Sequence, residues 1–384
     1  MIAKNELIAQ NELVARRVVI KIGSSTLTDT DGKMDTAYIE GLAQQVRNLL
    51  DRGVQVLIVS SAAIVAGLEA LKLPPARPKS IPLLQAAASV GQIELMKSYY
   101  RAFSANNIQI GQVLLTRNDT SSRNSYLHAR DTLEKLLELG VVPLINENDT
   151  VAIDEIRFGD NDRLAAQVAI LVKADLVILL SDIEGLYTAD PRIDEDAQLL
   201  QSIGSFTEEI ILSAGDAGSD RGSGGMVTKI EAARMLMAAG IPMVICEGHG
   251  NNVICDVACG KLVGTRFAAT NGKGQAHARK LWMALSGTVK GSVTVDDGAV
   301  TALRENGGSL LPVGVIGMEG KFVKGEAINI RTLGGFLIGR GLSNYASEEL
   351  KLAAGKKSYE IADDDYIGHL ANIEVIHRDQ MVIF

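Results

Sequence analysis

The sequence predicts an α/β fold with a mostly parallel open sheet sandwiched by helices, followed by a small β-rich domain. Short apolar runs recur between longer amphipathic segments, which is typical of helices that cover a parallel sheet. After about residue 268 the pattern changes to short alternating strands with glycine turns. The chain has 384 residues, more than one ordinary domain, so we expect two folded units.

Six apolar runs predict strands that are buried on both faces. They are RVVIKI (17–22), VQVLIVS (54–60), IQIGQVLL (108–115), VVPLIN (141–146), LVILLS (176–181) and IPMVIC (241–246). Amphipathic patterns between the runs predict helices over 36–53, 83–103, 163–174 and 228–240.

Composition sets the domain boundaries. The polar stretch ATNGKGQAHARK indicates a linker, and the duplicated NELIAQ and NELVAR near the N-terminus indicate a short helix. We therefore divide the chain into a lead-in segment (1–16), an α/β domain (17–268), a linker (269–278) and a β-rich domain with its tail (279–384). One helix is expected in the β-rich domain, at 298–306.

Charge and hydropathy argue against two classes of partner. The chain carries 46 Asp and Glu against 38 Lys and Arg, a net charge of −8, which gives nucleic acid no general attraction. Residues 277–384 are nearly neutral, so RNA binding there would have to be local and is not favoured. No apolar run reaches the roughly 18 residues of a membrane span, and the first residues lack the apolar core of a signal peptide. We expect no membrane contact and a cytoplasmic location.

Three cysteines and one histidine lie close together in the sequence: Cys246, His249, Cys255 and Cys259. Four such side chains could bind zinc. Their irregular spacing around a glycine-rich loop favours free thiols, and both interpretations stay open.

Polar residues follow four of the predicted strands, at the edge where open parallel sheets bind ligands. They are Lys21, Gly23, Ser24 and Ser25; Ser60 and Ser61; Asn146, Glu147, Asn148 and Asp149; and Ser181 and Asp182. Any one of these groups equally fits a turn, but four together predict a site.

Two lysines suggest that the ligand is a phosphate. Lys21 ends a buried strand, where an unpaired charge is costly; the alternative is a lysine that snorkels from an edge strand. Lys229 falls in the first turn of a helix after the glycine-rich stretch DRGSGGMV, a position that favours an anion; the alternative is a flexible turn. Neither a Walker A loop nor GxGxxG is present, which disfavours a dehydrogenase.

The segment 150–169 combines a predicted hairpin, TVAIDEIRF, with a helix start. The hairpin could act as a substrate lid. Asp160, Asn161 and Asp162 precede or begin the helix, and we expect one of them to be a plain N-cap.

Five motifs, in order, carry a resemblance to a known family: KIGSS, SSAAIVAG, NENDTVAIDEIRFGDND, LLSDIEGLYTADPR and GSGGMVTK. Over 17–268 the chain resembles the amino acid kinase family, and within it the glutamate 5-kinases. The β-rich domain resembles a PUA domain. The resemblance implies an enzyme that phosphorylates the γ-carboxylate of L-glutamate with ATP, the first step of proline synthesis. It also implies Mg²⁺ as cofactor, a homo-oligomer (dimer or tetramer) and feedback inhibition by proline.

The same resemblance implies roles for individual residues. Lys21 and Lys229 would hold the transferring phosphoryl group, with Asp162 between them. Ser61, Asp149 and Asn161 would bind glutamate. The ATP site would be formed by Lys21, Ser181, Asp182, Ser223, Gly224, Gly225, Met226, Val227, Thr228 and Lys229. No side chain is expected to bind the metal directly. A carboxylate nucleophile is ionised near pH 7 and needs no general base, so the five histidines are interpreted as structural or surface residues.

One departure concerns the turn after the second strand, where the family commonly has Ser-Gly-Ala and this chain has Ser61-Ala62-Ala63. Alanine fits there only if its φ is negative and no ligand presses against its Cα.

Two alternatives remain. One is another family member, such as an acetylglutamate or UMP kinase, against which the NEND block and the C-terminal domain speak. The other is a catalytically silent RNA-binding regulator, against which the intact lysines and the neutral C-terminal domain speak.

Overall fold

The chain forms two units, which divide after Asn271. The computed structural model describes residues 15–74, 76, 78–116, 119, 123–151, 161–207, 210, 225–269, 289–362 and 374–384. Most of the lead-in segment, of the proposed lid and of the linker lies outside these ranges, so the exact domain boundaries stay predictions.

An eight-stranded sheet forms the centre of the first unit, in the order β3-β4-β2-β1-β5-β7-β8-β6. All neighbours are parallel except β7 and β8, so the mostly parallel sheet is confirmed. The strands are β1 (Arg17–Ile22), β2 (Gln55–Ser60), β3 (Ile110–Leu115), β4 (Val142–Glu147), β5 (Leu176–Ser181), β6 (Ser202–Ile203), β7 (Met243–Glu247) and β8 (Thr265–Phe267).

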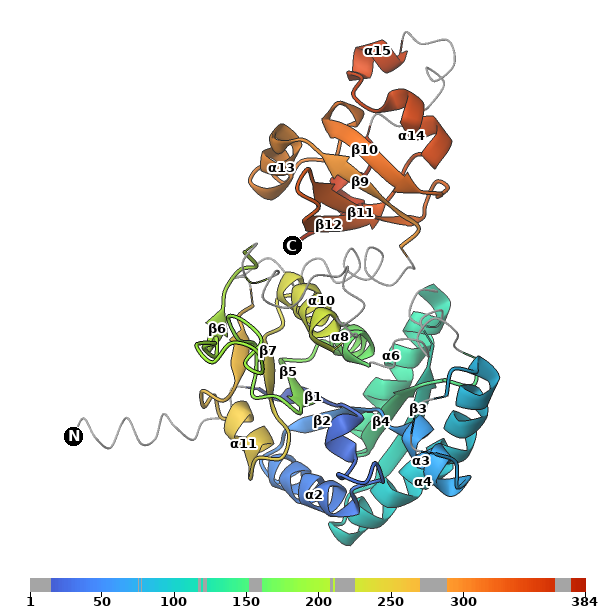
Figure 1. Cartoon of the computed structure of the whole chain (residues 1–384), viewed down its shortest axis with the longest axis vertical. Coiled ribbons are helices and arrows are strands. Elements are labelled where there is room, and N and C mark those ends of the chain that lie inside the picture. The colour runs from blue at the N-terminus through green and yellow to red at the C-terminus, as the bar shows by residue number, and fades with distance from the viewer. Residues whose placement is uncertain are drawn as a thin grey trace, which may run out of the picture. The chain divides into compact units, whose positions relative to one another are not determined.

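Helices cover both faces of this sheet (Figure 1), with α2, α4 and α11 on one side and α6, α8 and α10 on the other. They are α2 (Thr36–Leu50), α3 (Ala63–Ala70), α4 (Ile81–Ala105), α6 (Arg123–Glu138), α8 (Asp162–Leu171), α10 (Gly225–Ala238) and α11 (Val253–Ala258). Val18, Ile20 and Ile22 of β1 enter the core shared with α2, α4 and α11. Because side chains alternate along a strand, Lys21 lies on the opposite face, where α8 packs against β1.

Helices α3 and α4 cross so closely that their backbones touch. A Cβ on Gly67 would lie 1.8 Å from the carbonyl oxygen of Ala87, and one on Gly91 would lie 1.8 Å from that of Ala63. Only glycine permits this approach at either position. The crossing holds the start of α3, and with it the turn after β2, against the long helix α4.

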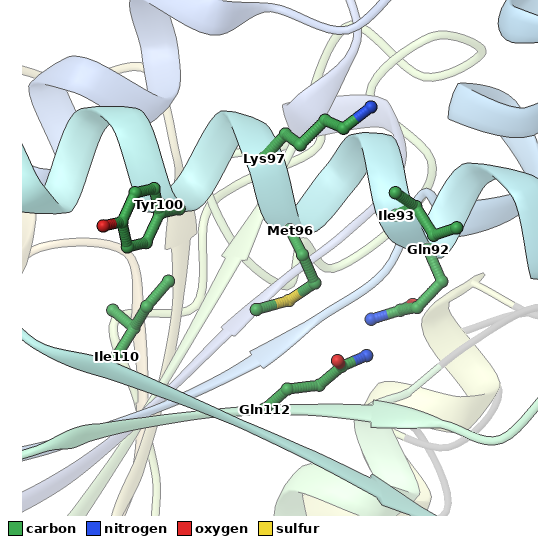
Figure 2. A pocket seen from close by; sticks show the side chains of 7 residues that line it. All are labelled: Gln92, Ile93, Met96, Lys97, Tyr100, Ile110 and Gln112. Atoms are coloured by element: carbon green, nitrogen blue, oxygen red, sulfur yellow. The ribbon is translucent and has the colours of Figure 1, made fainter.

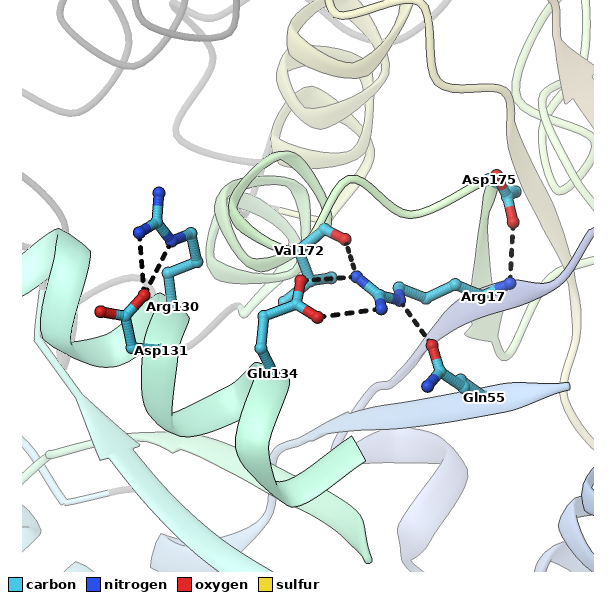
Figure 3. Close-up of polar contacts among 7 residues, drawn as sticks. All are labelled: Arg17, Gln55, Arg130, Asp131, Glu134, Val172 and Asp175. Carbon is cyan, nitrogen blue, oxygen red and sulfur yellow. Dashed lines mark hydrogen bonds and ion pairs between the residues drawn. The ribbon is translucent and has the colours of Figure 1, made fainter. Parts of the chain in front are cut away.

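A partly buried ion pair joins the amino end of β1 to its neighbours (Figure 3). The guanidinium of Arg17 pairs with both carboxylate oxygens of Glu134, at 2.7 and 3.0 Å, and also donates to Gln55 Oε1 at 2.9 Å and to the carbonyl of Val172. Asp175 Oδ2 accepts from the backbone N–H of Arg17 at 2.8 Å. One side chain thereby links β1 to β2, α6 and the C-terminal end of α8.

The second unit is built on a five-stranded sheet in the order β10-β9-β11-β12-β13, with β9 and β11 parallel and the other neighbours antiparallel. Its elements are β9 (Gly291–Val295), α13 (Asp297–Arg304), β10 (Val315–Gly320), β11 (Ala327–Thr332), β12 (Leu337–Leu342), α14 (Ser347–Ala353), α15 (Ser358–Ala362) and β13 (Met381–Ile383). Val293, Ile328, Ile338 and Leu350 belong to a core of its own. The predicted β-rich unit with a helix near 298–306 is confirmed.

None of the described helices is long and apolar enough to cross a membrane.

Candidate active site

A single carboxylate, Asp162, joins the two lysines singled out in the sequence. Asp162 is the first residue of α8 and its side chain is fully buried. Its Oδ1 lies 2.5 Å from Lys21 Nζ, and its Oδ2 lies 3.2 Å from Lys229 Nζ. Lys21 and Lys229 are 2% and 8% exposed. Residues from β1, α8 and α10, far apart in the sequence, therefore meet at one point.

The two lysines bring positive charge to this point. Among the described residues, the ammonium groups of Lys21 and Lys229 both contact the carboxylate of Asp162. Cations held close together in a buried site attract an anion, because electrostatic interactions are stronger there than in water. Lys21 lies on β1, between β2 and β5, which rules out the alternative of a lysine snorkelling from an edge strand.

The start of α10 contributes further polar groups. Lys229 is the fifth residue of the helix, beyond the first turn in which it was expected, and its Nζ folds back to donate to the carbonyl of Gly225 at 3.1 Å. The hydroxyl of Thr228 lies 3.0 Å from Asp162 Oδ2. Thr228 thus helps to hold the carboxylate, a role that the sequence did not suggest. Ser223 and Gly224 lie outside the described residues.

Gly23 keeps the space beside the first ammonium group open. A Cβ at this position would lie 3.8 Å from Lys21 Nζ, and any longer side chain would extend into the region that the ammonium faces. The turn that follows, Ser25–Leu27, is a short 3₁₀ helix.

A second group of buried polar side chains lies at the ends of β2 and β4. Asn161 occupies the N-cap position of α8 but makes no capping hydrogen bond. Its Nδ2 donates instead to the carbonyl of Ser60 at 2.7 Å and to Asn146 Oδ1 at 2.8 Å. Asn161 therefore is not the plain N-cap that was one of the expectations for this segment.

Ser61, the next residue after β2, has a hydroxyl that is buried without a hydrogen-bond partner among the described residues. An unsatisfied buried hydroxyl is costly, and a ligand at the site would satisfy it. Asp149 lies half-buried, two residues beyond the end of β4.

The turn after β2 departs from the expectation of a negative φ for alanine. Ala62 is buried and has φ 77° and ψ 7°, in the left-handed region. For a residue with a Cβ this conformation costs roughly 1–2 kcal/mol. The close crossing of α3 and α4 fixes the start of α3 and so maintains the strained turn. The prediction that alanine fits this turn only with a negative φ was wrong.

On the other side of the sheet centre, Ser181 ends β5 and its hydroxyl donates to Asp182 Oδ1 at 3.1 Å. Ser181 is buried and Asp182 is exposed, so this pair marks the rim of the site.

Three residues that the sequence left without a role connect to the site. Asn146 stood among the polar residues at strand ends, but Gln92 and Tyr99 gave no signal because they lie within the amphipathic pattern of α4. Gln92 Oε1 accepts from Asn146 Nδ2 at 2.8 Å, and the hydroxyl of Tyr99 lies 3.0 Å from Ser60 Oγ. Burial raises the pKa of Tyr99, so its phenol stays protonated.

The cysteine and histidine cluster shows other contacts. Cys255 Sγ donates to the carbonyl of Gln45 at 3.6 Å, Arg52 donates to Cys259 Sγ at 3.2 Å, and the ring of His249 packs against Tyr38. Burial raises the pKa of Cys246 to about 12, which keeps this thiol protonated near neutral pH. Within the described ranges, no group of three His, Cys, Asp or Glu side chains could hold a metal ion.

The fold and the paired lysines define a phosphate-handling α/β enzyme, and comparison with known proteins gives its family. Residues 16–247 match the model of the amino acid kinase family, and the chain belongs to that family. Residues 291–363 match the model of the PUA domain.

Its relatives include three proteins named glutamate 5-kinase. Those from Carboxydothermus hydrogenoformans, Paraburkholderia phymatum and Citrifermentans bemidjiense are 47%, 45% and 43% identical to it, each over 96% of this chain and 97–98% of their own. The solved structure of a UMP kinase from Bacillus anthracis covers 66% of this chain and 96% of its own, at 16% identity and a TM-score of 0.47.

Proposed function

We propose that the protein transfers the γ-phosphoryl group of ATP to the γ-carboxylate of L-glutamate, giving L-glutamyl 5-phosphate and ADP, the first step of proline synthesis. The observation that carries the chemistry is the buried contact of Asp162 with Lys21 and Lys229. The substrate is inferred from the relatives named glutamate 5-kinase, which align over nearly the whole chain.

In the proposed reaction, a γ-carboxylate oxygen of glutamate attacks the γ-phosphorus of ATP. A new O–P bond forms as the bond from that phosphorus to the bridging oxygen breaks, and ADP leaves with the electron pair. Negative charge spreads over the three equatorial oxygens in the transition state. Lys21 and Lys229 are buried, so their positive charges act there in a medium of low polarity. Asp162 orients both ammonium groups.

Glutamate binding is assigned to Ser61, Asp149 and Asn161. The unpartnered hydroxyl of Ser61 supports this assignment. So does the position of all three residues at the carboxyl edge of the sheet, where β2 and β4 end and α8 begins. A carboxylate such as Asp149 suits the α-ammonium group of the substrate.

ATP is assigned to the neighbouring carboxyl end of β5 and the start of α10. Ser181 and Asp182 would contact the nucleoside side, and the segment from Ser223 through Gly224, Gly225, Met226, Val227 and Thr228 to Lys229 would follow the phosphates. Mg²⁺ usually reaches such sites with the nucleotide, held by phosphate oxygens and water. The placement of Asp162 between two ammonium groups fits that mode, because its carboxylate oxygens are already engaged.

Two further properties rest on the family resemblance alone: assembly as a dimer or tetramer and inhibition by proline. The cytoplasmic location stays an expectation from the sequence. Sedimentation of the pure protein and proline titration of its activity would test the first two.

The substrate is tested by trapping the acyl phosphate. The enzyme would be incubated with ATP, Mg²⁺ and hydroxylamine together with L-glutamate, L-aspartate or N-acetylglutamate, and the hydroxamate formed would be measured. In a separate assay, UMP would replace the amino acid as phosphoryl acceptor and the release of ADP would be measured. We expect the strongest hydroxamate signal with L-glutamate. A larger signal with aspartate or N-acetylglutamate, or ADP release that depends on UMP, would assign the chain to another member of the family.

A further inference from the structure

We propose that Gln92 is a positioning residue for glutamate: through Asn146 it fixes the side-chain amide of Asn161 so that its oxygen receives the substrate's α-ammonium group. This inference rests on the proposed glutamate-binding role of Asn161. It concerns a residue of α4 that lies outside every motif of the family resemblance.

Three side-chain amides form a continuous chain from α4 to the start of α8. Asn161 Nδ2 donates to Asn146 Oδ1, and Asn146 Nδ2 donates to Gln92 Oε1, both at 2.8 Å. Asn146 is 3% exposed and Asn161 is 7% exposed, so water competes little for these bonds.

Backbone groups fix the direction of this chain at two points. The N–H of Glu147 can only donate, and it donates to Asn146 Oδ1 at 2.8 Å. The carbonyl of Ser60 can only accept, and it accepts from Asn161 Nδ2 at 2.7 Å. Rotating either asparagine amide by half a turn would set like groups against each other, so a single orientation is satisfied.

The consequence is a defined acceptor at the site. Both hydrogens of Asn161 Nδ2 are used, by Ser60 and Asn146, and no described residue donates to its Oδ1. Asn161 can therefore offer a ligand only an acceptor. Glutamate carries two carboxylates, which accept, and one ammonium group, which donates. The ammonium group is thus the part of the substrate that Asn161 can recognise.

Gln92 completes the outer end of the chain. It lines a groove of about 420 Å³ between α4 and β3, where Figure 2 shows it beside Met96 and across from Gln112 of the strand. Its Oε1 binds one hydrogen of Asn146 Nδ2 and so restrains the amide on which Asn161 depends. Without that acceptor, Asn146 keeps fewer constraints on its rotation and Asn161 is less well ordered.

The test compares Gln92→Met, which removes the acceptor, with Gln92→Glu, which keeps an oxygen in its place. Gln92→Met should raise the KM for glutamate about five-fold, the effect of losing one neutral hydrogen bond, with kcat and the KM for ATP little changed. Gln92→Glu should stay near the parent. Gln112→Met is the matched control, because it makes the same change in the same groove without touching the amide chain, and it should leave the KM for glutamate unchanged.

Two further measurements separate positioning from a general structural effect. Glutarate, which has both carboxylates but no ammonium group, should inhibit the parent and Gln92→Met equally well, whereas loosened packing would weaken both ligands. In an Asn161→Ala background, Gln92→Met should add nothing, because its effect passes through Asn161. If Gln92→Met is insoluble, Gln92→Ala is measured in its place, because it removes the same hydrogen-bond acceptor.

An unchanged KM for glutamate in Gln92→Met would overturn the inference. An equal rise in this KM in Gln112→Met would also overturn it. So would a further rise in this KM when Gln92→Met is added to Asn161→Ala. The proposed function fails in a different way. If Asn161→Ala alone leaves the KM for glutamate unchanged, Asn161 has no substrate role, whatever the Gln92 variants do.

Discussion

Among single residues, Asp162 has the largest influence on the electrostatics of the site, because it contacts both lysines. Its carboxylate is fully buried and contacts both Lys21 and Lys229, so it holds the two ammonium groups close together. Loss of either lysine would leave Asp162 paired with the other and remove one positive charge from the site. The fold should survive such a change, because the carboxylate keeps one counter-ion, but the attraction for a developing phosphoryl charge should not.

We therefore predict that Lys229→Met lowers kcat by about 100-fold or more, the usual cost of removing one group that stabilises transition-state charge. Lys21→Met should act in the same way. Steady-state kinetics measure the effect, and melting temperature with nucleotide titration shows whether the variants are folded and bind ATP. Near-normal turnover in either soluble variant would remove that lysine from the mechanism.

Single residues also show where sequence information ends. Lys21 could be identified because a charge inside a buried apolar run is unusual, and Asp162 because it lies in a dense polar segment. Gln92 and Tyr99 could not, because their contacts with Asn146 and Ser60 depend on how α4 packs beside β2 and β4. The strain at Ala62 was equally hidden, since the crossing of α3 and α4 maintains it rather than any local signal.

At the scale of elements, prediction succeeded where burial dominates. The six strands predicted from apolar runs all exist, with ends within about two residues. Five of them are buried on both faces, which gives a nearly continuous apolar sequence. The prediction of burial on both faces was wrong for β3, an edge strand on which only Leu115 is buried. Strands β6 and β8 were not predicted, since two or three residues are too short for a periodic signal. Their position at one edge of the sheet depends on pairing with β7, which only tertiary structure supplies.

The Arg17 network gives a prediction at this scale. Arg17→Lys should lower the free energy of unfolding by about 1–2 kcal/mol. A single ammonium group cannot replace the bidentate ion pair with Glu134. It also cannot keep the hydrogen bonds to Gln55 and Val172 at the same time. Activity of the folded enzyme should be nearly unchanged, since Arg17 and Lys21 lie at opposite ends of β1.

Arg130→Lys is the control for that experiment. Arg130 pairs with Asp131 on the surface of α6, as Figure 3 also shows, and both side chains are well exposed. Such pairs contribute less than about 1 kcal/mol, so denaturant unfolding should hardly change. Equal stabilities for the Arg17 and Arg130 variants would mean that the contacts of Arg17 contribute no more than an ordinary surface pair.

At the scale of the whole molecule, the two units have separate cores. Among the described residues, the core of α2, α4 and β1 contains none from the second unit, and the core around Val293, Ile328 and Leu350 contains none from the first. Near residue 268 the sequence changes to short alternating apolar and polar runs with glycine turns, and this change predicted the two units. The prediction succeeded because each unit buries its own apolar residues. All residues assigned to glutamate and ATP belong to the first unit.

We predict that a chain ending at residue 276 folds and keeps kinase activity, with altered assembly or regulation. Its sheet, both helical layers and the Lys21, Asp162 and Lys229 cluster are complete without the second unit. Denaturant unfolding should show one cooperative transition, kcat should stay within a few-fold of the full chain, and sedimentation with effector titration should reveal the difference. An insoluble product, or a soluble one without cooperative unfolding, would show that the first unit needs the second to fold. A folded but inactive product would show that the second unit completes the active site, although none of the assigned residues lies in it.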